Sequence, residues 1–379
     1  MGLITGGLNG RRFLASGLPD DFRKRLVESV CAHAFVAVPN ASDAELRVGW
    51  VDVFNPANAV FEQATFMFDH FVCLTLRIDK KTVNGAYKKI ALTERLAAIK
   101  VLRGVEKLSK TERTDAEEAL DAELFARALP SVAAVNVAWD TDSGEVIIFT
   151  ASEQVLELVK KRFEITFGAH LRPERMVDWL DDMPWDEIGQ RIDDHFPDAR
   201  GSRAASDVRE QEDPFEGVRF EVAADFITWL WLESEASEGR FKDADLTLWL
   251  ETRLKLQDVA DHDAPETTIL IGVAPSGTET ARRDLHTGKR PVEARLGLKL
   301  GEIECGLTLI AAPDGLMITG LKLPFEVKDG KTEKIYERML LLDLMQGTLK
   351  KLFLQFFVAR TTPGWADHVQ AWLTSESET

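Results

Sequence analysis

Three consecutive strand-like segments in the last quarter of the chain constrain its fold most. They are residues 291–300, 303–311 and 316–323. The segments are separated only by turn-forming residues, first Gly301 and then Pro313-Asp314-Gly315. Connections this short join antiparallel neighbours, because a parallel crossover needs about a dozen residues or more. A further hairpin is predicted within residues 132–150, across the turn Thr141-Asp142-Ser143-Gly144. Hairpins mixed with helices predict an α+β fold rather than a regular βαβ winding.

Local signals place the other elements. Residues 2–17 read as two strands around a glycine-containing turn, and Pro19-Asp20-Asp21 opens a helix with acids in its first turn. The sequence Ser109-Lys110-Thr111-Glu112 has the form of a capping box. Further helices are expected at 84–108, 109–129, 152–167, 223–234, 279–286, 332–360 and 365–373, and further strands at 47–53, 65–78, 245–256 and 268–273.

An acidic stretch suggests the domain organisation. Residues 178–216 contain thirteen acids against four arginines, and residues 197–216 lack any apolar periodicity. Such a segment is typical of a linker. We therefore predict an N-terminal α+β region at 1–196, an acidic linker at 197–216 and a C-terminal α+β region at 217–379.

One basic segment stands out in an acidic protein. Residues 71–113 hold eleven lysines and arginines against four acids, whereas the whole chain has a formal charge of −17. Concentrating the opposite charge in one segment creates a local field that attracts polyanions. A smaller patch at 281–299 has six basic residues against two acids. The basic segment is the first candidate for a phosphate-binding surface.

The basic residues of the helix predicted at 84–108 lie on one side of it. At about 100° per residue, six of them fall within an arc of roughly 140°. These six are Lys88, Lys89, Arg95, Lys100, Arg103 and Lys107. Leu92, Leu96 and Ile99 fall within the same arc, so the alternative is a solvated face whose lysine stems cover packed apolar residues.

Signals for catalysis are poor. The chain has no Gly-x-Gly-x-x-Gly, Gly-x-Ser-x-Gly or His-Glu-x-x-His motif, and Gly330-Lys331-Thr332 lacks the upstream glycine of a phosphate-binding loop. The cluster Asp178, Asp181, Asp182 and Asp186 could in principle hold Mg²⁺, but a solvated acidic loop is the favoured interpretation. The three cysteines are interpreted as small core residues, and Trp229, Trp231 and Trp249 as core aromatics. No cofactor and no metal site is expected.

Several short motifs, in order along the chain, resemble the RdgC family of recombination-associated proteins. Each motif is loose by itself, and their order and coverage carry the resemblance. They are residues 47–51 (RVGWV), 74–83 (LTLRIDKKTV), 107–113 (KLSKTER), 129–130, 137–140 (VAWD), 144–146, 226–230 (FITWL), 287–292 (TGKRPV) and 320–324 (GLKLP).

The resemblance implies a ring-shaped homodimer that encircles duplex DNA without sequence specificity and modulates recombination by limiting the access of RecA. Because residues 1–7 show no basic region followed by an apolar run and no stretch reaches about 18 uninterrupted apolar residues, we expect a cytoplasmic protein. Together with the poor catalytic signals, the resemblance favours a nucleoid-associated protein that is not an enzyme. On this interpretation the phosphate-binding residues are Lys80, Lys81, Lys88, Lys89, Arg95, Lys100, Arg103, Lys107, Lys110 and Arg113, with Arg253, Lys255, Lys289 and Arg290 as weaker candidates.

Two other functions remain open at this stage. The helix predicted at 109–129 is acidic, and together with the charge of −17 it favours a module of the same fold that binds protein partners and DNA weakly or not at all. The third possibility is a metal-dependent nuclease built on the aspartate cluster.

Overall fold

The computed structural model describes residues 3–4, 9–37, 46–199, 213–241, 246–258, 265–322 and 330–375. These residues form two compact units. We call residues 15–171 the hairpin unit, and residues 1–14 with 172–379 the C-terminal unit. The chain thus passes between units at 14/15 and 171/172, away from the linker predicted at 197–216. Because residues 200–212 lie outside the described part, the linker stays a prediction.

The α+β class is confirmed, and the first antiparallel sheet belongs mainly to the hairpin unit, with β1 and β7 spanning the unit boundaries at 14/15 and 171/172. The strand order is β2-β4-β5-β6-β1-β7, and β3 pairs with β4. Strand β4 pairs with β5 along its whole length, with Leu74 opposite Val137. The strands are β1 (Arg11–Ser16), β2 (Leu46–Val51), β3 (Met67–Phe68), β4 (Phe71–Lys81), β5 (Pro130–Asp140), β6 (Glu145–Ile148) and β7 (His170–Pro173). The predicted hairpin across residues 141–144 is present as β5 and β6.

Aromatic side chains fill the core of this unit. Helix α5 (Glu153–Phe167) presents Phe163 and Phe167 to the ring of Trp139 on β5, with centroid distances of 5.2 and 5.1 Å. Helix α1 (Phe22–Ala32) packs beside α5. Trp50, in the RVGWV motif, is fully buried and donates a hydrogen bond to Thr166 Oγ1 at 2.9 Å. Burial of an indole with its N–H satisfied makes Trp50 a core residue.

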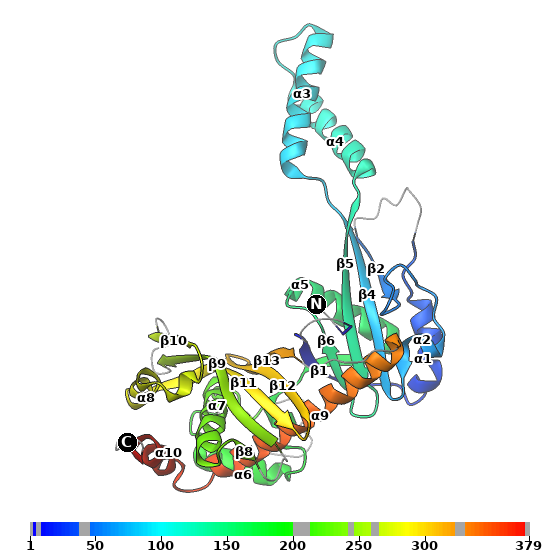
Figure 1. Cartoon of the computed structure of the whole chain (residues 1–379). Coiled ribbons are helices and arrows are strands. Elements are labelled where there is room, and N and C mark those ends of the chain that lie inside the picture. The colour runs from blue at the N-terminus through cyan, green and yellow to red at the C-terminus, as the bar shows by residue number, and fades with distance from the viewer. Residues whose placement is uncertain are drawn as a thin grey trace. The chain divides into compact units, whose positions relative to one another are not determined.

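Two helices join β4 to β5. Figure 1 shows α3 (Gly85–Arg103) and α4 (Lys110–Arg127) extending beyond the ends of these strands as a helical hairpin. Asn84 caps α3 by accepting from the backbone N–H groups of Ala86 and Tyr87, and Gly104 ends it in the left-handed conformation, with φ of 65°. The capping box predicted at Ser109 and Glu112 begins α4 and is confirmed.

The C-terminal unit is built on a second antiparallel sheet. Its order is β10-β9-β11-β12-β13, and β8 pairs with β9. The three consecutive strands predicted from the sequence form its β11-β12-β13 half. The strands are β8 (Arg240–Phe241), β9 (Leu246–Asp258), β10 (Thr267–Ile271), β11 (Lys289–Leu300), β12 (Ile303–Ala312) and β13 (Gly315–Lys322).

Helix α7 (Arg219–Ala236) lies between this sheet and helix α9 (Lys331–Arg360). Residues 222–232 of α7 are all buried, which explains why its sequence is apolar on every side. Phe226 of α7 packs against Phe353 and Phe356 of α9 with centroid distances of 5.3 Å. Trp229 and Trp231 are buried, as predicted, whereas Trp249 is only half-buried, with its ring directly over Gly297.

The acidic region before residue 197 contains structure that the sequence did not predict. It holds the 3₁₀ helix η1 (Met176–Leu180) and helix α6 (Trp185–His195). Asp178 is buried and accepts hydrogen bonds from the side chains of Arg172 and Arg175. The favoured interpretation of a solvated acidic loop is therefore wrong at Asp178, although Asp182 is exposed.

Among its described residues, the C-terminal unit also contains helices α8 (Glu279–His286) and α10 (Trp365–Ser375), and the short η4 (Pro275–Gly277) precedes α8. No helix among the described residues is long and apolar enough to cross a membrane.

One expectation for the cysteines fails. Cys73 and Cys305 are buried, but Cys31 is exposed. It lies near the end of α1, a helix whose described buried residues are Leu26 and Val30.

Candidate nucleic-acid interface

The basic segment follows β4 into the helical hairpin. Strand β4 is almost entirely buried up to Asp79, and its last two residues, Lys80 and Lys81, bring the chain to the surface. Lys80 is exposed, whereas the ammonium of Lys81 lies over the ring of Phe125 on α4, 5.5 Å from its centroid. This cation–π contact couples the end of β4 to the second helix.

Three of the six predicted stripe residues are paired with acids of α4. Lys88 Nζ lies 2.8 Å from Asp121 Oδ2 and 3.0 Å from Glu117 Oε1. Hydrogen bonds to Asp121 and Glu117 raise the pKa of Lys88. Arg95 Nη1 donates to Glu123 Oε2 at 3.0 Å, and Arg103 pairs with Glu112. These cations hold the two helices together, so they are partly neutralised before any ligand binds.

The charge of the whole hairpin differs from that of the basic segment. Residues 85–127 contain nine lysines and arginines against eight acids, because α4 brings five acids after residue 113. The hairpin is therefore nearly neutral overall. The acids of α4 therefore offset most of the positive charge that residues 71–113 carry.

Six basic residues of the segment 71–113 make no ion pair or side-chain hydrogen bond with the described residues. They are Lys80, Lys89, Lys100, Lys107, Lys110 and Arg113, all exposed, and we call them the open cations. On α3, Lys89 and Lys100 are eleven residues apart and so about 20° apart around the axis, whereas Lys88 lies about 100° from Lys89. The cationic arc predicted from the sequence thus divides into cations paired with α4 and a line of open lysines on α3. Lys107, predicted on the same arc, lies beyond the end of α3 at Arg103.

The weaker candidates belong to the C-terminal unit and do not form one surface. Arg253 pairs with Glu293, and Lys255 is half-buried. Lys289 is only 7% exposed and donates to Glu266 Oε1 at 2.8 Å and to Asp284 Oδ2 at 3.3 Å. Arg290 lines a pocket. Since Lys289 connects β11 with α8 and the segment before β10, we leave it out of the interface.

Carboxylates for metal-dependent chemistry are not brought together in the described part of the chain. No group of three or more His, Cys, Asp or Glu there could hold a metal ion. Of the aspartates considered for a nuclease, Asp178 is occupied by its two arginines. Burial alone would raise the pKa of Asp178, but the hydrogen bonds from Arg172 and Arg175 outweigh it, and the pKa lies below its usual range.

Sequence reasoning missed the ion pairs between α3 and α4. The acids that pair with Lys88 and Arg95 follow them by 28 to 33 residues. The sequence did indicate an acidic face that could pair with a neighbouring helix, because Glu117 and Asp121 are four residues apart and so share a face of α4. Which cations meet that face depends on how the helices pack, and this packing fixes which lysines stay open.

The fold and the surface define a class of protein: an α+β chain with two antiparallel sheets and a projecting helical hairpin that carries open cations. Residues 22–180 match the family model described as "RdgC: Putative exonuclease, RdgC". The match covers most of the hairpin unit and the start of the C-terminal unit, and it confirms the resemblance to the RdgC family over these residues. It supports a DNA-associated role related to recombination. Curated proteins gave no match to the chain.

Proposed function

We propose that this protein binds duplex DNA without sequence specificity through the open cations of the helical hairpin. The observation that carries the proposal is the line of Lys89 and Lys100 on α3, continued by Lys107, Lys110 and Arg113 around the turn into α4. Each of these side chains is exposed and lacks a protein partner among the described residues. A lysine without an ion pair can contact a phosphate without first leaving a protein carboxylate. Phosphate contacts supply the affinity of non-specific DNA binding.

A pair of triple variants tests this proposal. The open variant carries Lys89→Gln, Lys100→Gln and Lys107→Gln. The control carries Lys24→Gln, Lys299→Gln and Lys351→Gln, three exposed lysines elsewhere in the chain, so the two variants have the same net charge. For the open variant, the slope of log K against log salt should flatten by about 0.9 for each phosphate that the protein no longer neutralises. The control slope should match that of the wild type.

Equal slopes for the two variants would favour the solvated-face interpretation of the hairpin. The alternative function, a module that acts through protein partners, would then be the better one. It rests on the near-neutral charge of residues 85–127 and on the formal charge of −17.

We further propose a homodimer in which the turn of the hairpin is one contact. Val101 and Leu102, at the end of α3, are 83% and 88% exposed, and Val105 follows in the turn. Large apolar side chains gathered at the end of a projecting element are typical of an interaction surface. Two copies joined at such ends and at a second contact would close a ring, the assembly that the resemblance implies.

Light scattering tests the contact. Replacing Val101 and Leu102 by Ser should lower the dimer mass toward that of the monomer at micromolar concentration. Val36 and Val60 are also exposed apolar residues of the hairpin unit, and replacing them by Ser is the matched control. A wild-type mass equal to one chain would refute the dimer.

We also propose that the bound protein limits the access of RecA to DNA. RecA assembly on DNA should be slowed by the wild type, and less by the open variant. No enzymatic activity is part of the proposal, and Mg²⁺-dependent loss of the DNA during these assays would instead identify a nuclease.

A further inference from the structure

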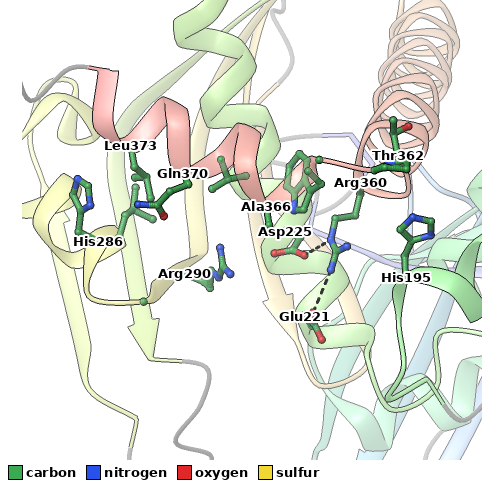
Figure 2. A pocket seen from close by; sticks show the side chains of 16 residues that line it. His195, Glu221, Asp225, His286, Arg290, Arg360, Thr362, Ala366, Gln370 and Leu373 are labelled. Carbon is green, nitrogen blue, oxygen red and sulfur yellow. Dashed lines mark hydrogen bonds and ion pairs between the residues drawn. The ribbon is translucent and has the colours of Figure 1, made fainter.

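A pocket of about 510 Å³ is lined by residues of the C-terminal unit. It is formed by α7, α8, the start of β11, the end of α9 and helix α10 (Figure 2). Its volume is within the range of small-molecule sites, about 300–1,000 Å³. Its lining includes the apolar side chains of Leu285, Trp365, Val369 and Leu373.

The two carboxylates of the pocket are already engaged. Arg360 Nε donates to Asp225 Oδ2 at 2.7 Å, and its Nη2 lies 3.4 Å from Glu221 Oε1 (Figure 2). Burial, and then the charge of Asp225, raise the pKa of Glu221 against the opposing charges of Arg360 and Arg290. A cationic ligand would have to compete with Arg360 for these acids. Glu221 and Asp225 are therefore not free to bind a ligand.

Arg290 is different. It is half-buried, enters the pocket from β11, and makes no side-chain hydrogen bond or ion pair among the described residues. A planar guanidinium pairs best with a phosphate or carboxylate, to which it can donate two parallel hydrogen bonds. His286 and Gln370 stand on the same side of the pocket and can donate further hydrogen bonds.

We propose that this pocket binds a small organic anion whose phosphate or carboxylate group pairs with Arg290 and whose apolar or aromatic body lies against Trp365 and Val369. A mononucleotide has the required size and both parts. The site does not rest on DNA binding by the hairpin, because its residues belong to the other unit. It also gives Arg290 a role other than contact with a DNA backbone.

Calorimetric titration of the full-length protein tests the proposal. The probes are thymidine 5′-monophosphate, uncharged thymidine and phenylacetate. Thymidine lacks the phosphate and so measures binding of the nucleoside body alone, and phenylacetate tests a carboxylate in place of the phosphate. At least one of the two anions should bind saturably below about 10 mM, and thymidine should bind more weakly. Arg290→Gln should weaken anion binding by about tenfold or more, the loss expected for a hydrogen bond between charged groups.

Two further variants complete the design. Arg283→Gln, on the exposed side of α8, removes the same charge outside the pocket and should leave the affinity within about twofold, since exposed charges act weakly through solvent. Arg290→Lys keeps the charge and should retain part of the affinity. If Arg290→Gln does not fold, the reduced affinity of Arg290→Lys relative to the wild type is the result that tests the proposal. Failure of both anions to bind the wild type up to about 10 mM, or equal binding by Arg290→Gln and Arg283→Gln, would overturn the proposal.

Discussion

The indole Nε1 of Trp372 on α10 donates a hydrogen bond to Oε2 of Glu235 on α7, at 2.8 Å. The same carboxylate accepts from Trp231 Nε1 at 2.7 Å and from Arg282 Nη2 on α8 at 3.0 Å. The rings of Trp231 and Trp372 meet edge to face, 5.4 Å apart. Glu235 thus joins three helices, and α10, the last described element of the chain, covers one side of the pocket.

Removing the Trp372 side chain should release α10. Trp372→Ala loses both the hydrogen bond and the buried ring, so residues 365–375 should exchange their amide hydrogens faster while α7 stays protected. Trp372→Phe keeps most of the ring packing and loses only the hydrogen bond to the carboxylate, which costs about 1.5–3 kcal/mol, so it should give a smaller increase. Thr374→Ala, on the same helix, is the control. Unchanged exchange in Trp372→Ala would show that α10 is held by other contacts.

The Asp178 carboxylate should stabilise the C-terminal unit in a pH-dependent way. Its pKa is lower in the folded state than in the unfolded chain. The stabilisation is therefore complete above the unfolded pKa, about 4, and is lost as the pH falls through the folded pKa. At pH 7, Asp178→Asn should lower the free energy of unfolding by about 3 kcal/mol, because it leaves two arginines without their partner.

Urea unfolding between pH 3 and pH 7 measures this effect. The difference between the wild type and Asp178→Asn should shrink as the pH falls below about 4. Asp182 is exposed, and Asp182→Asn should change stability by no more than about 0.5 kcal/mol. A constant difference across the pH range would contradict an ionised Asp178.

Much of the helical hairpin was predictable because its signals are local. The capping box at Ser109 and Glu112 fixes the start of α4. Helix α3 ends at Arg103, before the end predicted at 108, because Gly104 adopts the left-handed conformation. The strands β11, β12 and β13 were predictable for the same reason, since short turns leave antiparallel pairing as the arrangement.

Local sequence signals do not predict whether each candidate cation is paired with an acid or open. Lys88 and Lys89 are adjacent in sequence, yet Lys88 is paired with α4 and Lys89 is open. The difference depends on the rotation of one helix against the other. The prediction of a solvated loop in the acidic region was wrong at Asp178 for a related reason. The carboxylate of Asp178 can be buried because Arg172 and Arg175 donate hydrogen bonds to it.

Thiol reactivity should separate the three cysteines. Burial raises the pKa of Cys73 and raises that of Cys305 to about 11, so both remain protonated and covered near pH 8. Cys31 is exposed. A disulfide reagent should modify one thiol rapidly in the native protein and three after unfolding. Cys31→Ser should abolish the fast phase, and a fast phase that persists would mean that a second thiol is reached by local opening.

Two glycine-to-alanine substitutions should change stability in opposite directions. A Cβ at Gly49, in the RVGWV motif, would lie 2.4 Å from the Cα of Phe35. The backbones cannot separate easily, because Phe35 N–H donates to Trp50 O at 2.8 Å and Trp50 N–H donates to His33 O at 3.0 Å. Gly49→Ala should therefore lower the free energy of unfolding by about 1–3 kcal/mol, the usual cost of overpacking.

Gly347 is the matched comparison. It lies inside helix α9, and a Cβ there would meet nothing within 4 Å. Alanine has the higher helix propensity, so Gly347→Ala should raise the stability of the C-terminal unit by up to about 1 kcal/mol. Thermal unfolding followed by circular dichroism measures both changes. If Gly49→Ala were as stable as the wild type, the close approach between β2 and residues 33–35 would not exist in solution.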